Sequence, residues 1–196
     1  IARPERLSSD ANSEDVSQAI ASLLQEDWLE LGPEGPAFPS GTVRDGILEA
    51  IPAEQRRQLH AAAAAALAQE TGAGRAFERA FHLKAAGLWE DLLQLVLELV
   101  PTAQAMGHPA RVLVLVDWAL ESIAQIKGDG DSRQTTGDSI SVQQALVLHG
   151  AAADAAGGLG RRPIESKHLN ALVELPFDSE KHPAEMARVF LLHGHA

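Results

Sequence analysis

Alanine and leucine dominate this chain, with 34 alanines and 26 leucines among its 196 residues. Aromatic residues make up only 4% of the sequence, and tyrosine does not occur. Strands favour β-branched and aromatic side chains, whereas alanine and leucine are among the best helix formers. The composition therefore predicts a mostly α-helical protein and nearly excludes an all-β one.

The chain is acidic, with 16 basic and 27 acidic residues and a formal net charge of −11. This balance argues against binding to nucleic acid or to an anionic membrane surface. The sequence contains no cysteine, which excludes disulfides, thiol catalysis and cysteine-bound metals and is compatible with the cytoplasm, our expected location. No signal peptide or membrane-spanning run is visible. The last residues stop inside an apolar pattern, so we expect a piece of a larger protein.

The first 57 residues predict a linker followed by a small mixed domain. Residues 1–14 are polar and are predicted to be the linker. Apolar residues then recur on one helical face over residues 15–27. An alternating segment, a Gly/Pro turn at 32–36 and residues 37–39 predict a β-hairpin. Ser40 or Thr42 is expected to cap the next helix, which ends before Pro52.

The pattern of apolar residues, glycines and prolines over residues 58–196 predicts one helix after another. Pro101 is expected to break or kink the helix that begins at Leu88, and residues 127–138 to form a polar loop. The helices expected from Pro52 onward begin near residues 52, 75, 88, 109, 139, 161 and 183.

A short internal repeat indicates how these helices are arranged. Leu148–Ala152 recurs 44 residues later as Leu192–Ala196, with small residues on a first helix and a glycine turn before the second. This pattern is typical of αα-hairpin repeats, which bury their apolar faces only against neighbouring repeats. We therefore expect a solenoid similar to tetratricopeptide repeats, although the tryptophan and tyrosine landmarks of that repeat are absent. Gly150 and Gly194 are expected where two helices approach closely.

Five segments of the chain also carry a family resemblance. In their order along the chain, they resemble the region after the ATPase core of bacterial signal-transduction ATPases with numerous domains. That class includes LuxR-type and maltose-regulator-like transcription factors and kinase-linked relatives. The segments are Leu23–Leu29, Phe38, Val43–Leu48, Gln55–His60 and Ala80–Trp89.

The resemblance implies a winged-helix-like relay domain at residues 15–57 and TPR-like repeats at 58–196 that are incomplete at the C-terminus. It implies a non-enzymatic regulatory segment whose partners are other domains of the parent protein and a protein or small-molecule inducer. Many relatives carry a histidine two residues after the hairpin phenylalanine. Ser40 stands there, so no role of that histidine is carried over.

Motifs for catalysis and for cofactor binding are missing from the sequence. A phosphate-binding loop of the form Gly-x-x-x-x-Gly-Lys-Ser/Thr does not occur, nor does a nucleophile elbow or a His-Glu-x-x-His pair. His149, His168 and His182 have no second histidine three or four residues away. We therefore expect no catalytic residue, no cofactor and no metal in this segment, although the parent protein could be an ATPase or a kinase.

Two alternatives remain open from the residues alone. Trp89 and Trp118 are either partly buried packing residues or weak candidates for a protein-binding hot spot. The main alternative function is a DNA-binding winged-helix regulator. Against that alternative, residues 1–57 contain eleven acidic residues and only five arginines, whereas DNA-binding surfaces are basic.

Overall fold

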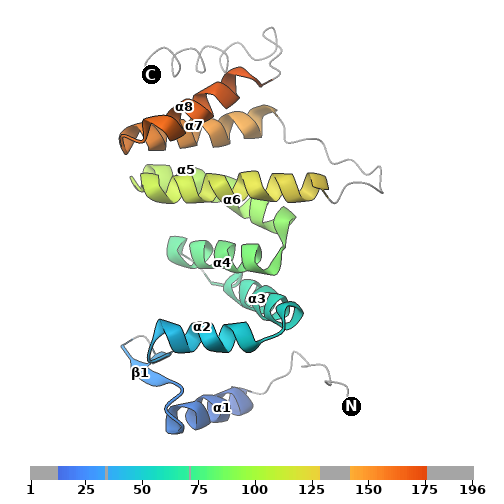
Figure 1. The fold of residues 1–196 in the computed structure, drawn as a ribbon, viewed down its shortest axis with the longest axis vertical. Helices are drawn as coiled ribbons and strands as arrows, with labels where there is room; N and C mark the ends of the chain where they lie inside the picture. Colours follow the sequence, from blue (N-terminus) through green and yellow to red (C-terminus); the bar gives the residue numbers. More distant parts are fainter. Residues whose placement is uncertain (1–12, 34, 71, 129–141, 176–196) are drawn as a thin grey trace. The chain divides into compact units, whose positions relative to one another are not determined.

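The structure is a computed structural model that describes residues 13–33, 35–70, 72–128 and 142–175. Within these ranges the chain is mostly helical, with one small antiparallel sheet, which confirms the predicted class (Figure 1). The chain divides into two compact units, Ile1–Arg56 and Arg57–Ala196. The boundary falls near the start of a helix, and each unit is described by itself.

The first unit contains two helices and a hairpin. Its elements are α1 (Ser13–Gln25), β1 (Glu30–Gly32), β2 (Gly35–Ala37) and α2 (Gly41–Ala50).

The predicted hairpin is present, but its turn is shorter than predicted, because Gly32, Gly35 and Pro36 belong to the strands. Its strands pair in antiparallel register, with Glu30 opposite Ala37 and Gly32 opposite Gly35. Gly35 has a φ of 120°, which L-residues rarely adopt, so the glycine is needed where the second strand begins.

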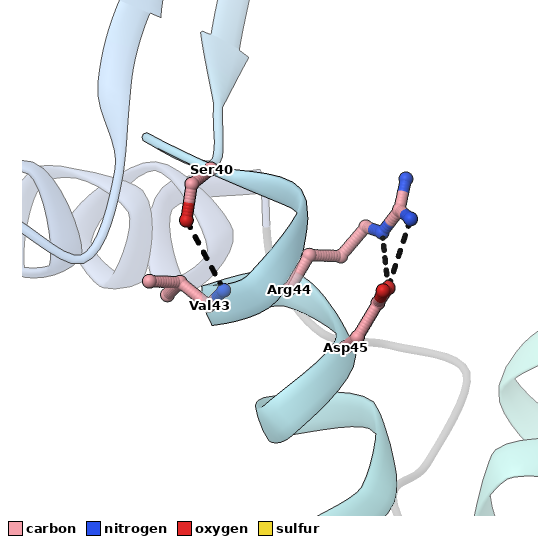
Figure 2. Close-up of polar contacts among 4 residues, drawn as sticks. All are labelled: Ser40, Val43, Arg44 and Asp45. Atoms are coloured by element: carbon pink, nitrogen blue, oxygen red, sulfur yellow. Dashed lines mark hydrogen bonds and ion pairs between the residues drawn. The ribbon is translucent and has the colours of Figure 1, made fainter.

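Ser40 caps α2, as one of the two predicted candidates. Its hydroxyl oxygen accepts a hydrogen bond from the backbone N–H of Val43 at 3.3 Å (Figure 2). This bond satisfies one of the donors that the first turn of a helix leaves unpaired. The neighbouring Arg44–Asp45 ion pair is exposed on both sides and adds little stability.

The first unit buries almost nothing in the part that the structure describes. None of residues 17–33 and 35–56 is buried, and Leu31 and Trp28 are 75% and 47% exposed. By itself this unit therefore leaves much of its apolar surface uncovered.

The second unit consists of six helices in its described part. They are α3 (Ala53–Leu67), whose first residues precede the boundary, α4 (Ala73–Ala86), α5 (Trp89–Ala105), α6 (Pro109–Gly128), α7 (Val142–Gly158) and α8 (Arg162–Val173).

From α4 to α8, each helix packs against the next one in the chain, and α5 also packs against α7 (Figure 1). Leucine and valine fill the core at Leu92, Val96 and Leu115, all 0% exposed. Ala80 and Ala152 are equally inaccessible. Alanine and leucine, the two residue types that dominate the composition, thus both contribute to the core.

Three of these helices end in the same way. The N–H groups of Leu88, His108 and Arg161 each donate to the carbonyl five residues earlier, at 2.8–3.0 Å. A glycine precedes each of these residues, and Gly87, for example, has a φ of 74°. This is the Schellman termination, which needs a left-handed residue and satisfies carbonyls at the helix end.

Pro101 does not break the helix, one of its two predicted effects, since α5 continues through it to Ala105. A kink at Pro101 stays a prediction. The proline ring is exposed, while Val100 and Ala103 beside it are 0% and 1% exposed. A proline in a helix removes the hydrogen bond to the carbonyl four residues earlier. Packing of the flanking core residues keeps this turn helical in spite of that loss.

Candidate functional site

A cleft of about 240 Å³ lies between α6 and α8. Each helix contributes residues spaced three or four apart, which is one helical face. The lining residues are Ala110, Leu113, Val114 and Asp117 of α6, and Arg161, Ile164, Lys167 and His168 at the start of α8 and along it.

The cleft combines an apolar floor with charged edges. Arg161 and Lys167 bring two positive charges, and Asp117 brings one negative charge. In the part of the chain that the structure describes, these three side chains form no ion pair with one another or with other residues.

The imidazole of His168 lines the cleft and is also bound to a second imidazole on α7. His168 is only 2% exposed, and its Nδ1 lies 2.9 Å from the Nδ1 of His149. The ring centroids are 5.2 Å apart, so the two rings extend in nearly opposite directions from the contact. Such an in-line contact fits an N–H of one neutral ring that donates to the lone pair of the other.

Both rings are held in the neutral state. The pKa of His168 is lowered to about 4. Burial is the largest cause, followed by the neighbouring His149 and Lys167. Asp117 acts in the opposite direction but is the weakest of these influences. Burial, followed by the charge of Lys167, also lowers the pKa of His149. A pair of neutral rings is the state in which one can donate and the other accept.

A second histidine pair joins α3 and α4 with the same geometry. The Nδ1 atoms of His60 and His82 are 2.9 Å apart, and the ring centroids 5.1 Å apart. Both rings are only partly buried, and the exposed ring of Phe81 meets them edge-on. The same contact between two imidazoles thus occurs twice. The His60–His82 pair is only partly buried, whereas the other pair includes the buried His168.

Sequence reasoning missed both pairs, because it searched for histidines close together in the chain. His149 and His168 are 19 residues apart, and His60 and His82 are 22 apart. A usable signal was present: two helices joined by a short turn bring residues equidistant from that turn opposite each other.

The candidates Trp89 and Trp118 lie outside the cleft and pack, half-buried, against the core of the second unit. The ammonium of Lys84 sits 5.7 Å from the centroid of the Trp118 ring and also pairs with Glu121. A role for Trp89 or Trp118 in binding a protein stays a prediction.

Among the described residues, no three His, Asp or Glu side chains form a group that could hold a metal ion. His182 and the histidines of Leu192–Ala196 lie outside the described residues. In the same described part, each helix is too short or too polar to cross a bilayer.

The prediction of a close helix approach at Gly150 is wrong, and Gly194 lies outside the described residues. A Cβ added to Gly150 would meet no atom within 4 Å, although the residue is buried. The crowded glycine is Gly157, where a Cβ would lie 2.8 Å from Oε1 of Glu165. The close neighbour of Gly157 is therefore the Glu165 side chain of α8 and not the backbone of another helix.

Comparisons with family models, with curated proteins and with solved structures found no match for this chain.

Proposed function

We propose that this chain is a non-enzymatic regulatory segment of a larger bacterial signalling protein. In this proposal the first unit is a winged-helix-like relay, and the second is an arm of TPR-like repeats that binds a partner. The arm passes the effect of binding to a nucleotide-binding core elsewhere in the parent protein, which is an ATP-binding regulator or a repeat-containing kinase of the cytoplasm.

The observation that carries the proposal is the serial packing of the second unit. Helices α4 to α8 each pack against the next, and the same glycine-based termination closes α4, α5 and α7. Proteins built in this way present extended surfaces that suit a peptide, a helix or another domain.

The first unit supports the relay role in a different way. None of residues 17–33 and 35–56 is buried, and Trp28, Leu31 and Phe38 are between 38% and 75% exposed. Exposed apolar side chains favour cover by a partner, because removing apolar surface from water is favourable. A neighbouring domain of the parent protein would supply the missing cover.

The test is deletion of residues 75–196 from the parent protein. We expect the deletion to change basal activity and to abolish the response to the inducing signal. A parent with Glu78→Ala, which removes one exposed carboxylate of α4, is the matched control and should respond normally. A truncated parent that responds with normal amplitude would contradict the proposal.

Two binding assays on the chain itself separate this proposal from its rivals. Calorimetric titration with Mg-ATP should show no saturable heat, because the phosphate-binding loop is missing. A gel shift with duplex DNA at physiological salt should show no complex, because the acidic chain releases few counterions. A salt-sensitive DNA complex would favour the winged-helix DNA-binding regulator instead.

A further inference from the structure

We propose that the His149–His168 pair is an acid-sensitive fastener that holds α8 on α7 and releases it when both rings are protonated. The proposal does not depend on the proposed function. It rests on the contact between the two Nδ1 atoms, on the burial of His168 and on the surroundings of the pair.

The hydrogen bond between the two rings survives when one of them is protonated, but it is lost when both are. With one ring protonated, its Nδ1–H still donates to the free lone pair of the other ring. With both protonated, two N–H groups and two positive charges face each other across 2.9 Å. The second proton therefore replaces a hydrogen bond with a repulsion.

The surroundings of the pair do little to compensate a second charge. On α8, Lys167 adds a positive charge, and Arg161 brings another to the cleft that His168 lines. From α6, Asp117 is the carboxylate whose charge favours protonation. The nearby apolar cluster of α7 and α8 offers no counter-charge; it consists of Leu146, Ala153, Leu169, Leu172 and Leu175.

Release of the fastener would affect both the end of the helical unit and the cleft. Leu169 and Leu172 of α8 are 3% and 0% exposed, so a shift of α8 would uncover them. One wall of the cleft belongs to α8 and would move with it. Acidification would thus open an apolar surface on α7 and α8 and remove the cleft in the same step.

The sign of the pH effect follows from the neutral state of the folded pair. Unfolded histidines take up protons below their ordinary pKa of about 6.5, whereas the folded pair resists them. Stability is therefore lost as the pH falls from about 6.5, and the loss levels off near the folded pKa of His168, about 4. From His168 alone, the folding equilibrium constant should fall about 20-fold between pH 7 and pH 5.

The experiment uses urea unfolding of the full chain at several values of pH between 7.5 and 4.5. The double variant His149→Leu/His168→Leu should lose most of the 20-fold change. The matched control His60→Leu/His82→Leu leaves the His149–His168 pair intact, so it should keep the change attributed to His168. Carboxylates other than Asp117 are expected to contribute equally to all three proteins, so the differences between them report on the histidine pairs together with the effect of Asp117.

A second measurement covers the case in which the double variant does not fold. NMR titration of the histidine rings in the unaltered chain should show that the His168 ring stays neutral to below pH 5 while the protein is folded. The His149 ring should take up its proton below the ordinary histidine pKa of about 6.5. The proposal is overturned if every folded ring titrates near pH 6.5. It is also overturned if the His149/His168 variant and the unaltered chain share one pH dependence.

Discussion

Gly150→Ala should stabilise the second unit. The residue lies inside α7, has no positive φ, and an added Cβ would have no atom within 4 Å. A glycine in a helix interior costs about 1 kcal/mol relative to alanine, because it loses more backbone freedom on folding. With space available, nothing offsets this gain, and the expected increase in the free energy of unfolding is about 1 kcal/mol.

Gly157→Ala in the same helix is the matched control. Its Cβ would lie 2.8 Å from Oε1 of Glu165, and the Glu165 side chain is only 14% exposed and bound to Arg162 at 2.7 Å. The carboxylate must move aside and loosen that pair. Gly157 also stands in the last turn of α7, where helix propensity counts less. We expect a gain well below that of Gly150→Ala, or a small loss.

Urea unfolding followed by tryptophan fluorescence measures both effects. A Trp28→Phe background removes the tryptophan of the first unit, so that Trp89 and Trp118 report on the second unit alone. A gain of about 1 kcal/mol corresponds to a rise in melting temperature of about 3 °C for a protein of this size. A Gly150→Ala variant that is less stable than the parent chain would refute the reasoning, since it would mean that the buried site has no room for a methyl group.

Three further changes test other parts of the structure. Ser40→Ala should lower the stability of α2 by about 1 kcal/mol through loss of its N-cap bond, measured by hydrogen exchange of the helix amides. Leu115→Ala should cost about 2–5 kcal/mol in urea unfolding, because the side chain is 0% exposed and leaves a cavity. Glu121→Gln, which removes the partly exposed pair with Lys84, should cost at most about 1 kcal/mol, and high salt should erase the difference.

Local signals predicted most of the fold. The recurrence of apolar residues identified the described helices, and the Gly/Pro segment identified the hairpin between residues 30 and 37. A glycine after a helix is a local signal of the same kind, and Gly87 ends α4 through its left-handed backbone. Each of these features depends on residues within a few positions of one another, which is the range over which sequence patterns are informative.

The failures involve contacts that local patterns do not contain. Pro101 lies in a helix because core residues on either side of it are buried, and burial depends on which helices pack together. Gly150 was expected at a crowded position because small residues surround it in the sequence. The space around its Cα depends instead on where neighbouring helices diverge, and no property of residues 148–152 specifies that.

The histidine pairs could have been predicted in part: the sequence indicates which rings meet, but not how deeply they are buried. Halfway between His60 and His82 lies residue 71, and halfway between His149 and His168 lies the Gly158–Leu159 step. In the sequence, the first midpoint falls between the end of α3 at Leu67 and the start of α4 at Ala73, and the second falls at the end of α7. In a pair of helices that fold back on each other, this symmetry alone brings the two rings into register. What the sequence does not contain is their burial. His168 is 2% exposed, whereas the rings of His60 and His82 are only partly buried. The burial that lowers the pKa of His168 is therefore a property of the packed unit and not of the histidine itself.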